Sequence, residues 1–194
     1  MLDLDFDFND YEDIDQVATK EKRVYFDLEE SFKRLKQKMR MPEKNESIRT
    51  ISPAGGWSSC SLLMYLANEE VIDELFITTL RVGKKEMAAL TDLIKQGRIK
   101  KCKIVLCDIS KENTRNGKKY DYQETFEEAC ERLDIEFVYR RNHAKVILAK
   151  TKKNHYVVET SSNFNENPKI EQFIFSNSKE IYEFYVNQFG KLGM

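Results

Sequence analysis

The chain has 194 residues, which suits one domain of ordinary size with an added arm and is enough to bury a hydrophobic core. Charged residues make up 34% of it, yet the formal net charge is −1, so the overall balance predicts neither a nucleic-acid nor a membrane partner. The first residues lack a signal-peptide pattern, no apolar run approaches the ~20 residues that span a bilayer, and the cysteines include no CxxC pair. We therefore expect a cytoplasmic protein with reduced thiols, no membrane span and no zinc site.

Charge is segregated along the chain. The opening MLDLDFDFNDYEDID contains acids and no bases, whereas basic stretches such as KQGRIKKCK and YRRNHAKVILAKTKK come later. We expect residues 1–20 to form an acidic, irregular arm, because acids alternate there with apolar residues that have no partner within the segment. The arm is either a solvated tail or an interaction element, which lies in a basic cleft in place of a nucleic-acid backbone or helps two chains associate.

Residues 21–44 are expected to form a helix and a linker, since Leu28, Phe32, Leu35 and Met39 recur at helical spacing before Pro42 breaks the pattern. A strand is then expected around residues 48–52. Helices and strands alternate after it in the order SSCSLLMYLANEE, DELFITTL, KKEMAALTDLIKQG, KKCKIVLCDI, YQETFEEACERL and IEFVYRR. Strands separated by helices of this length are typical of crossover connections in a parallel sheet.

The rhythm changes after residue 140. The segments AKVILAK and HYVVETS are joined by the short polar TKKN, which predicts a hairpin, and EQFIFS supplies one more strand. A last helix, NSKEIYEFYVNQF, takes Asn177 or Ser178 as its N-cap. The predicted fold is α/β, with a mixed, largely parallel sheet and helices on both faces, formed by residues 45–194.

Polar residues gather at the edges of the last strands. His143 and Lys145 are two residues apart at the start of a strand, so both side chains leave the same face. Ser161 and Asn163 repeat this spacing after the next strand. Glu171 opens the strand that follows, where it could hold the tautomer of the imidazole. Each residue alone suits an ordinary strand end or turn, but the ordered set suits an anionic, oxygen-rich reacting group.

The segments HAK, TSSNFNEN and IEQ resemble the HxK(x4)D…GSxN…E signature of the phospholipase D superfamily. The resemblance is greatest to its small bacterial and phage endonuclease-like members, which have one motif per chain. It covers residues 45–190 or so and excludes the arm and the first helix. The sequence departs from the signature twice, because its aspartate falls on Lys150 and its glycine on Thr160.

The resemblance implies roles for the matching residues. His143 would attack phosphorus to form a phosphohistidine, while Lys145 and Asn163 bind the nonbridging oxygens. Ser161 would support that phosphate site, and Glu171 would orient a histidine. The resemblance implies neither a metal nor another cofactor.

The resemblance also implies a homodimer, in which His143 of a second chain protonates the leaving oxygen. The other histidine, His155, has no companion lysine. The implied function is a metal-independent phosphodiesterase, most plainly a nuclease, acting on nucleic acid or another phosphodiester.

Two other functions stay open. One is a nucleic-acid-binding module on the same fold with lost or weakened chemistry, which Lys150 and Thr160 favour. The other is a scaffold or regulatory protein that uses the acidic arm. The loop SPAGGWSSCS is either an ordinary helix cap or a border of the phosphate site. The basic stretches are either solvated or bind a polyanion.

Overall fold

The structure is a computed structural model that describes residues 30–53, 56–108, 114–115, 118–119, 122–165 and 169–194. The expected arm at residues 1–20 lies outside them. Residues 30–38 are helical, as the spacing of apolar residues predicts, and Leu35 and Met39 are buried in the core. No helix among the described residues is both long and apolar enough to cross a membrane.

Seven strands form the main sheet, in the order β1-β9-β8-β7-β2-β3-β6. Their bounds are β1 (Glu46–Ser52), β2 (Ile72–Thr79), β3 (Cys102–Cys107), β6 (Glu136–Arg140), β7 (Val146–Thr151), β8 (His155–Thr160) and β9 (Glu171–Asn177). The helices are α2 (Ser59–Glu69), α3 (Lys84–Lys95), α4 (Tyr122–Arg132) and α5 (Lys179–Lys191). A small hairpin, β4 (Thr114–Arg115) with β5 (Lys118–Lys119), is separate from the main sheet.

The α/β fold with a mixed sheet is confirmed, but the expectation that the sheet is largely parallel is wrong. Within the described sheet, only β2–β3 and β3–β6 pair in parallel, and the other four pairings are antiparallel. The predicted hairpin β7–β8 continues into β9, and β1 pairs with β9 rather than with β2. Alternating helices and strands predicted the parallel half; they carry no information about which distant strand lies alongside β1.

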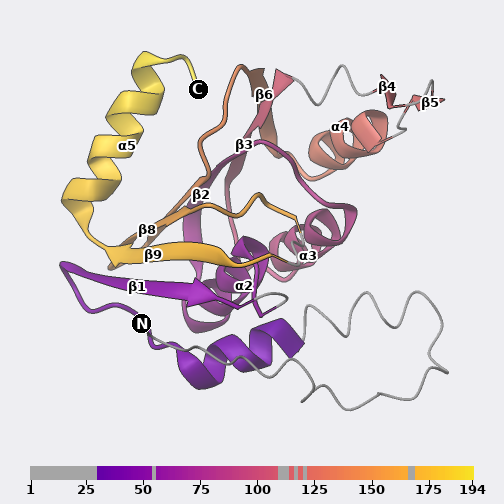
Figure 1. Cartoon of the computed structure of the whole chain (residues 1–194). Coiled ribbons are helices and arrows are strands. Elements are labelled where there is room, and N and C mark those ends of the chain that lie inside the picture. The colour runs from indigo at the N-terminus through magenta and orange to yellow at the C-terminus, as the bar shows by residue number, and fades with distance from the viewer. Residues whose placement is uncertain (1–29, 54–55, 109–113, 116–117, 120–121, 166–168) are drawn as a thin grey trace, which may run out of the picture.

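Helices cover both faces, as expected, with α2, α3 and α4 on one side and α5 on the other (Figure 1). Side chains in β7 alternate between the two layers, because successive residues of a strand point to opposite faces. Ile147 joins the core beneath α2 and α3, whereas Val146 and Leu148 pack with Tyr182 and Phe189 of α5. The N-cap of α5 is Ser178, whose side chain accepts a hydrogen bond from the Ile181 N–H, one of the two predicted positions.

The antiparallel half of the sheet brings strand ends and strand starts together. Ser52 at the end of β1 pairs with Glu171 at the start of β9, and Thr78 near the end of β2 pairs with Val146 at the start of β7. Val146 also pairs with Glu159, so the end of β8 lies at the same edge. At this end of the sheet β1, β2 and β8 end and β7 and β9 begin, and we call it the site end.

Candidate functional site

His143 and Lys145 lie in contact just before β7, at the site end. Lys145 Nζ donates a hydrogen bond to His143 Nδ1 at 3.2 Å and another to the His143 carbonyl oxygen at 3.1 Å. His143 is exposed and Lys145 is half-buried. The structure therefore brings these two side chains together and leaves the imidazole accessible to a ligand from solvent.

Asn142, which the sequence analysis did not single out, fixes the segment that carries this pair. Its Nδ2 donates to Thr78 Oγ1 at 2.5 Å, and its Oδ1 accepts from the Ala144 N–H at 2.8 Å. Asn142 is 9% exposed, and these side-chain bonds replace ladder bonds where β7 has not yet begun. An asparagine directly before the His-x-Lys pair was the available signal, because asparagine commonly hydrogen-bonds the backbone two residues ahead.

Ser161 and Glu171 form a second pair. Ser161 Oγ donates to Glu171 Oε2 and also accepts from the Gln172 N–H at 3.0 Å. The carboxylate is buried, while Ser161 is at the exposed rim. The predicted partnership of Glu171 with the imidazole stays a prediction, because Nδ1 of His143 faces Lys145 here.

Electrostatics connect the two pairs. Burial lowers the pKa of Lys145, and the negative charge of Glu171 partly opposes that shift. The ammonium is thus held near the carboxylate in a partly desolvated place, where its charge acts more strongly on a bound anion than it would in water. Such an environment suits a lysine that binds a phosphate oxygen.

Asn163 follows Ser161 in the same loop, which lies against the start of α2. The Ser59 hydroxyl of α2 donates to the Asn163 carbonyl oxygen at 2.8 Å. The Asn163 side-chain Oδ1 is buried and has no hydrogen-bond partner among the described residues. The start of α2 therefore lies against the loop that carries Asn163, and the possibility that SPAGGWSSCS borders a phosphate site stays a prediction. Asn163 is close in sequence to Ser161, but no described contact joins its side-chain amide to the His143–Lys145 pair or to the Ser161–Glu171 pair.

Thr160, at the glycine position of the signature, shapes this loop. Its Oγ1 donates to the Gln172 carbonyl oxygen at 2.9 Å and accepts from the Ser162 N–H at 3.0 Å. The methyl-bearing side chain is therefore fixed by backbone groups of the loop and of β9. It ties the start of the Ser161–Asn163 segment to its neighbouring strand.

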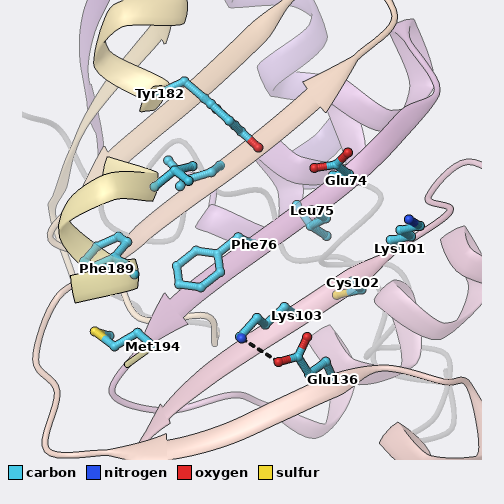
Figure 2. A pocket seen from close by; sticks show the side chains of 13 residues that line it. Glu74, Leu75, Phe76, Lys101, Cys102, Lys103, Glu136, Tyr182, Phe189 and Met194 are labelled. Carbon is cyan, nitrogen blue, oxygen red and sulfur yellow. Dashed lines mark hydrogen bonds and ion pairs between the residues drawn. The ribbon is translucent and has the colours of Figure 1, made fainter. Parts of the chain in front are cut away.

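A separate groove of about 460 Å³ lies on the face of the sheet that α5 covers, between α5 and the beginnings of β2 and β3 (Figure 2). Phe76, Phe189 and Met194 line it, and Lys103 and Glu136 form an ion pair at 2.5 Å along its rim. It contains none of the residues that the sequence predicted for the site. Among the described residues, no group of three His, Cys, Asp or Glu side chains is placed to hold a metal ion.

Comparison with known proteins gives matches of structure alone. No protein-family model and no curated protein match the chain. Polyphosphate kinase from Porphyromonas gingivalis is 18% identical over 74% of this chain and 25% of that chain, with a TM-score of 0.57. Phosphatidylserine synthase from Haemophilus influenzae Rd KW20 is 14% identical over 89% of this chain and 46% of that chain, with a TM-score of 0.52. The archaeal chromatin protein TrmBL2 is 10% identical over 89% and 64% of the two chains, with a TM-score of 0.48.

At these identities the likeness shows the fold alone, so the chain shares an α/β fold with the two enzymes. It spans about a quarter of the length of the polyphosphate kinase and under half of the synthase.

Proposed function

We propose that this chain is a metal-independent phosphodiesterase that cleaves nucleic acid through a phosphohistidine at His143, and that it acts as a homodimer. The observation that carries the proposal is the contact between His143 and Lys145 beside the Ser161–Glu171 pair, at one end of a phospholipase D-like sheet. The two enzymes among the structural neighbours give support, because the polyphosphate kinase and the phosphatidylserine synthase are both named for phosphate compounds. A nuclease, rather than another phosphodiesterase, is what the resemblance to endonuclease-like members with one motif per chain implies.

The proposed reaction has two displacements at phosphorus. A nitrogen of the His143 imidazole attacks, the N–P bond forms, the P–O bond to the leaving group breaks, and the leaving oxygen takes a proton from the partner's His143. Water then attacks phosphorus and gives its proton to the partner's His143 as the N–P bond breaks. Charge on the nonbridging oxygens is stabilised by Lys145, with Asn163 as a neutral donor.

The contact of Lys145 Nζ with His143 Nδ1 bears on which tautomer of the imidazole reacts. A neutral imidazole that accepts at Nδ1 carries its proton on Nε2, which is the tautomer of a proton donor. The nucleophilic tautomer needs a free lone pair on Nε2. A phosphate that draws Lys145 away from Nδ1 permits that tautomer, and the buried Glu171 carboxylate is the candidate acceptor for the new Nδ1–H.

Two chains are proposed because His155 is too distant to act as the second histidine. His155 opens β8 opposite Lys150, and its ring packs against Tyr182 with centroids 5.1 Å apart. Thr160 is five residue steps further along β8, roughly 16 Å at ~3.3 Å per step. It therefore lies at the other end of the sheet, and a second site-end histidine has to come from a second chain.

The first experiment measures hydrolysis of bis-p-nitrophenyl phosphate and of single- and double-stranded DNA and RNA in EDTA, with His143→Ala as the comparison. We expect cleavage that survives EDTA and falls by a factor of about 10² to 10⁴ or more in the variant. Cleavage that persists unchanged in His143→Ala contradicts the assigned nucleophile.

A second experiment tests the shared site. Wild-type and His143→Ala chains, mixed in equal amounts under conditions that allow exchange, are expected to retain about a quarter of the wild-type activity, because only dimers of two wild-type chains are active. Retention of about half indicates that each chain works independently, which excludes the two-histidine mechanism.

A binding module with weakened chemistry is the second candidate. The observation that favours it is Thr160, which stands at the glycine position of the signature and is bonded to the backbone of Gln172 and Ser162. Binding of nucleic acid without cleavage, equal in wild type and in His143→Ala, would select this candidate.

A further inference from the structure

Exposed basic side chains without an ion pair occur at both ends of the described sheet, and three of them lie near the candidate site. Away from the site end, many are paired with acids, at Arg40–Glu46, Lys100–Asp73, Lys103–Glu136, Lys150–Glu74 and Lys179–Glu183. At the site end, Arg81, Lys84 and Arg141 are exposed, and none of the three forms an ion pair with a described residue. The whole chain has 33 acids for 32 lysines and arginines, so cations without acids do not follow from general basicity.

Arg81 and Lys84 are held against the loop that carries Asn163. The Arg81 carbonyl oxygen accepts from Thr79 Oγ1 at 3.0 Å, and the same Oγ1 accepts from the Phe164 N–H at 2.9 Å. Lys84 follows Gly83, whose N–H donates to the Phe164 carbonyl oxygen at 2.9 Å. The backbone that carries both cations therefore lies directly beside the site loop, on its β2–α3 side.

Arg141 lies on the other approach to the site. It precedes Asn142, which is anchored to Thr78 at the end of β2, and it is two residues before His143. Its position is fixed by the same bonds that fix the His143 segment. Cations thus flank the His143–Lys145 pair along the chain before it and along the β2–α3 loop beside it.

We propose that Arg81, Lys84 and Arg141 bind phosphates of a nucleic-acid strand that flank the phosphate at His143 and Lys145. The inference rests on the proposed function and adds to it that the substrate is a polymer, gripped at several phosphates, rather than a small phosphodiester. Exposed cations without acidic partners bind the backbone of nucleic acid by displacing its counterions. Contacts of this kind set the register of the strand and carry no base preference.

The test compares two variants that lose the same charge. One is Arg81→Gln with Lys84→Gln and Arg141→Gln; the control is Lys36→Gln with Lys95→Gln and Lys152→Gln, three exposed lysines outside the site end. Binding of a fluorescent single-stranded oligonucleotide is measured by anisotropy over a range of salt. Each lost phosphate contact lowers the slope of log K against log salt by about 0.7, so the site-end variant is expected to lose about 2 from its slope. The control is expected to keep the wild-type slope.

Outcomes separate this inference from the proposed function. Cleavage of the strand, relative to that of bis-p-nitrophenyl phosphate, is expected to fall at least tenfold in the site-end variant and to stay constant in the control. An unchanged slope in the site-end variant, or a wild-type protein that does not bind the strand, overturns the inference even if the small ester is hydrolysed. Inorganic polyphosphate is titrated in the same way as a second probe. If the site-end variant loses salt dependence with polyphosphate but not with the oligonucleotide, the inference is also overturned. If wild type hydrolyses nothing, the proposed function fails, while the slopes still decide whether these cations bind a strand.

Discussion

Lys150 donates a hydrogen bond to Glu74 at 2.9 Å across the β7–β2 pair, where the two residues are direct register partners. The position at which the signature has an aspartate therefore carries a cation matched by an acid. Lys150 is five residues beyond Lys145, roughly 16 Å along the strand, and the odd spacing turns its side chain to the opposite face. This departure from the signature lies outside the site.

Reversing the charge at Lys150 is expected to lower stability without raising activity. Lys150→Asp removes a partly exposed ion pair and sets two carboxylates opposite each other, at a cost of about 1 kcal/mol. Urea denaturation measures the cost, and bis-p-nitrophenyl phosphate hydrolysis measures activity. The double variant Glu74→Lys with Lys150→Asp restores the pair with reversed charges and should recover stability. A large gain in activity from Lys150→Asp alone would mean that the position acts on the site.

Placing the glycine of the signature at position 160 is expected to lower the free energy of unfolding. Thr160→Gly removes the hydroxyl that bonds Gln172 and Ser162, and it frees the backbone of the loop, for a loss of about 1 to 2 kcal/mol. Activity should fall with it, because Ser161 and Asn163 lose their fixed register. Thr160→Ser keeps the hydroxyl and serves as the control. If Thr160→Gly cleaves faster than wild type, the side chain obstructs substrate, contrary to this expectation.

Asn142 is expected to act as a positioning residue for His143. Asn142→Ala removes both side-chain bonds of the segment, and a small displacement of the reacting group can cost a factor of about 10² in rate. We expect kcat to fall by about 10- to 100-fold, with KM nearly unchanged.

A matched variant separates positioning from stability. Asn154→Ala removes a comparable bond, from Asn154 Nδ2 to Glu70 Oε1 at 2.7 Å, at the other end of the sheet. Its unfolding free energy should fall by a similar amount, about 1 to 3 kcal/mol, while kcat stays near the wild-type value. Equal losses of kcat in the two variants would mean that Asn142 acts through the stability of the fold and not by positioning His143.

The pKa of Lys145 predicts how activity depends on alkaline pH. Burial lowers the pKa of this lysine, so its ammonium loses its proton at a lower pH than an ordinary lysine does. Because only the protonated form binds phosphate, kcat/KM should decline as pH rises toward that lowered pKa. A bound phosphate raises the pKa, so kcat should decline at higher pH than kcat/KM does. Lys145→Arg, which stays charged, should show neither decline. A decline that survives in Lys145→Arg must come from another group.

The acidic arm stays a prediction, because residues 1–20 lie outside the described part of the chain. If the arm lies against the cations at the site end, its deletion should tighten the binding of single-stranded DNA and steepen the dependence on salt. Anisotropy titrations of the full and shortened chains measure both. Unchanged affinity and slope would leave the arm as a solvated tail, or as the interaction element of a scaffold.

Much of the fold was predictable from local patterns. Periods of two and of 3.6 residues located the main strands and helices, the short polar link TKKN located the β7–β8 hairpin, and a serine located the start of α5. The two-residue hairpin strands β4 and β5 were missed, because a strand of that length has no measurable period. The order of the strands was missed too, and with it the antiparallel half of the sheet.

The sequence by itself determined which groups the candidate site contains, since it places five polar residues in a fixed order at the edges of apolar segments: His143, Lys145, Ser161, Asn163 and Glu171. Only the tertiary structure decided which of them meet. It paired Ser161 with Glu171, set Lys145 on His143, and moved Lys150 away to Glu74. The physical reason is that periodicity records the local direction of a side chain, whereas the partner of a strand is chosen by packing and hydrogen bonding between segments far apart in the chain.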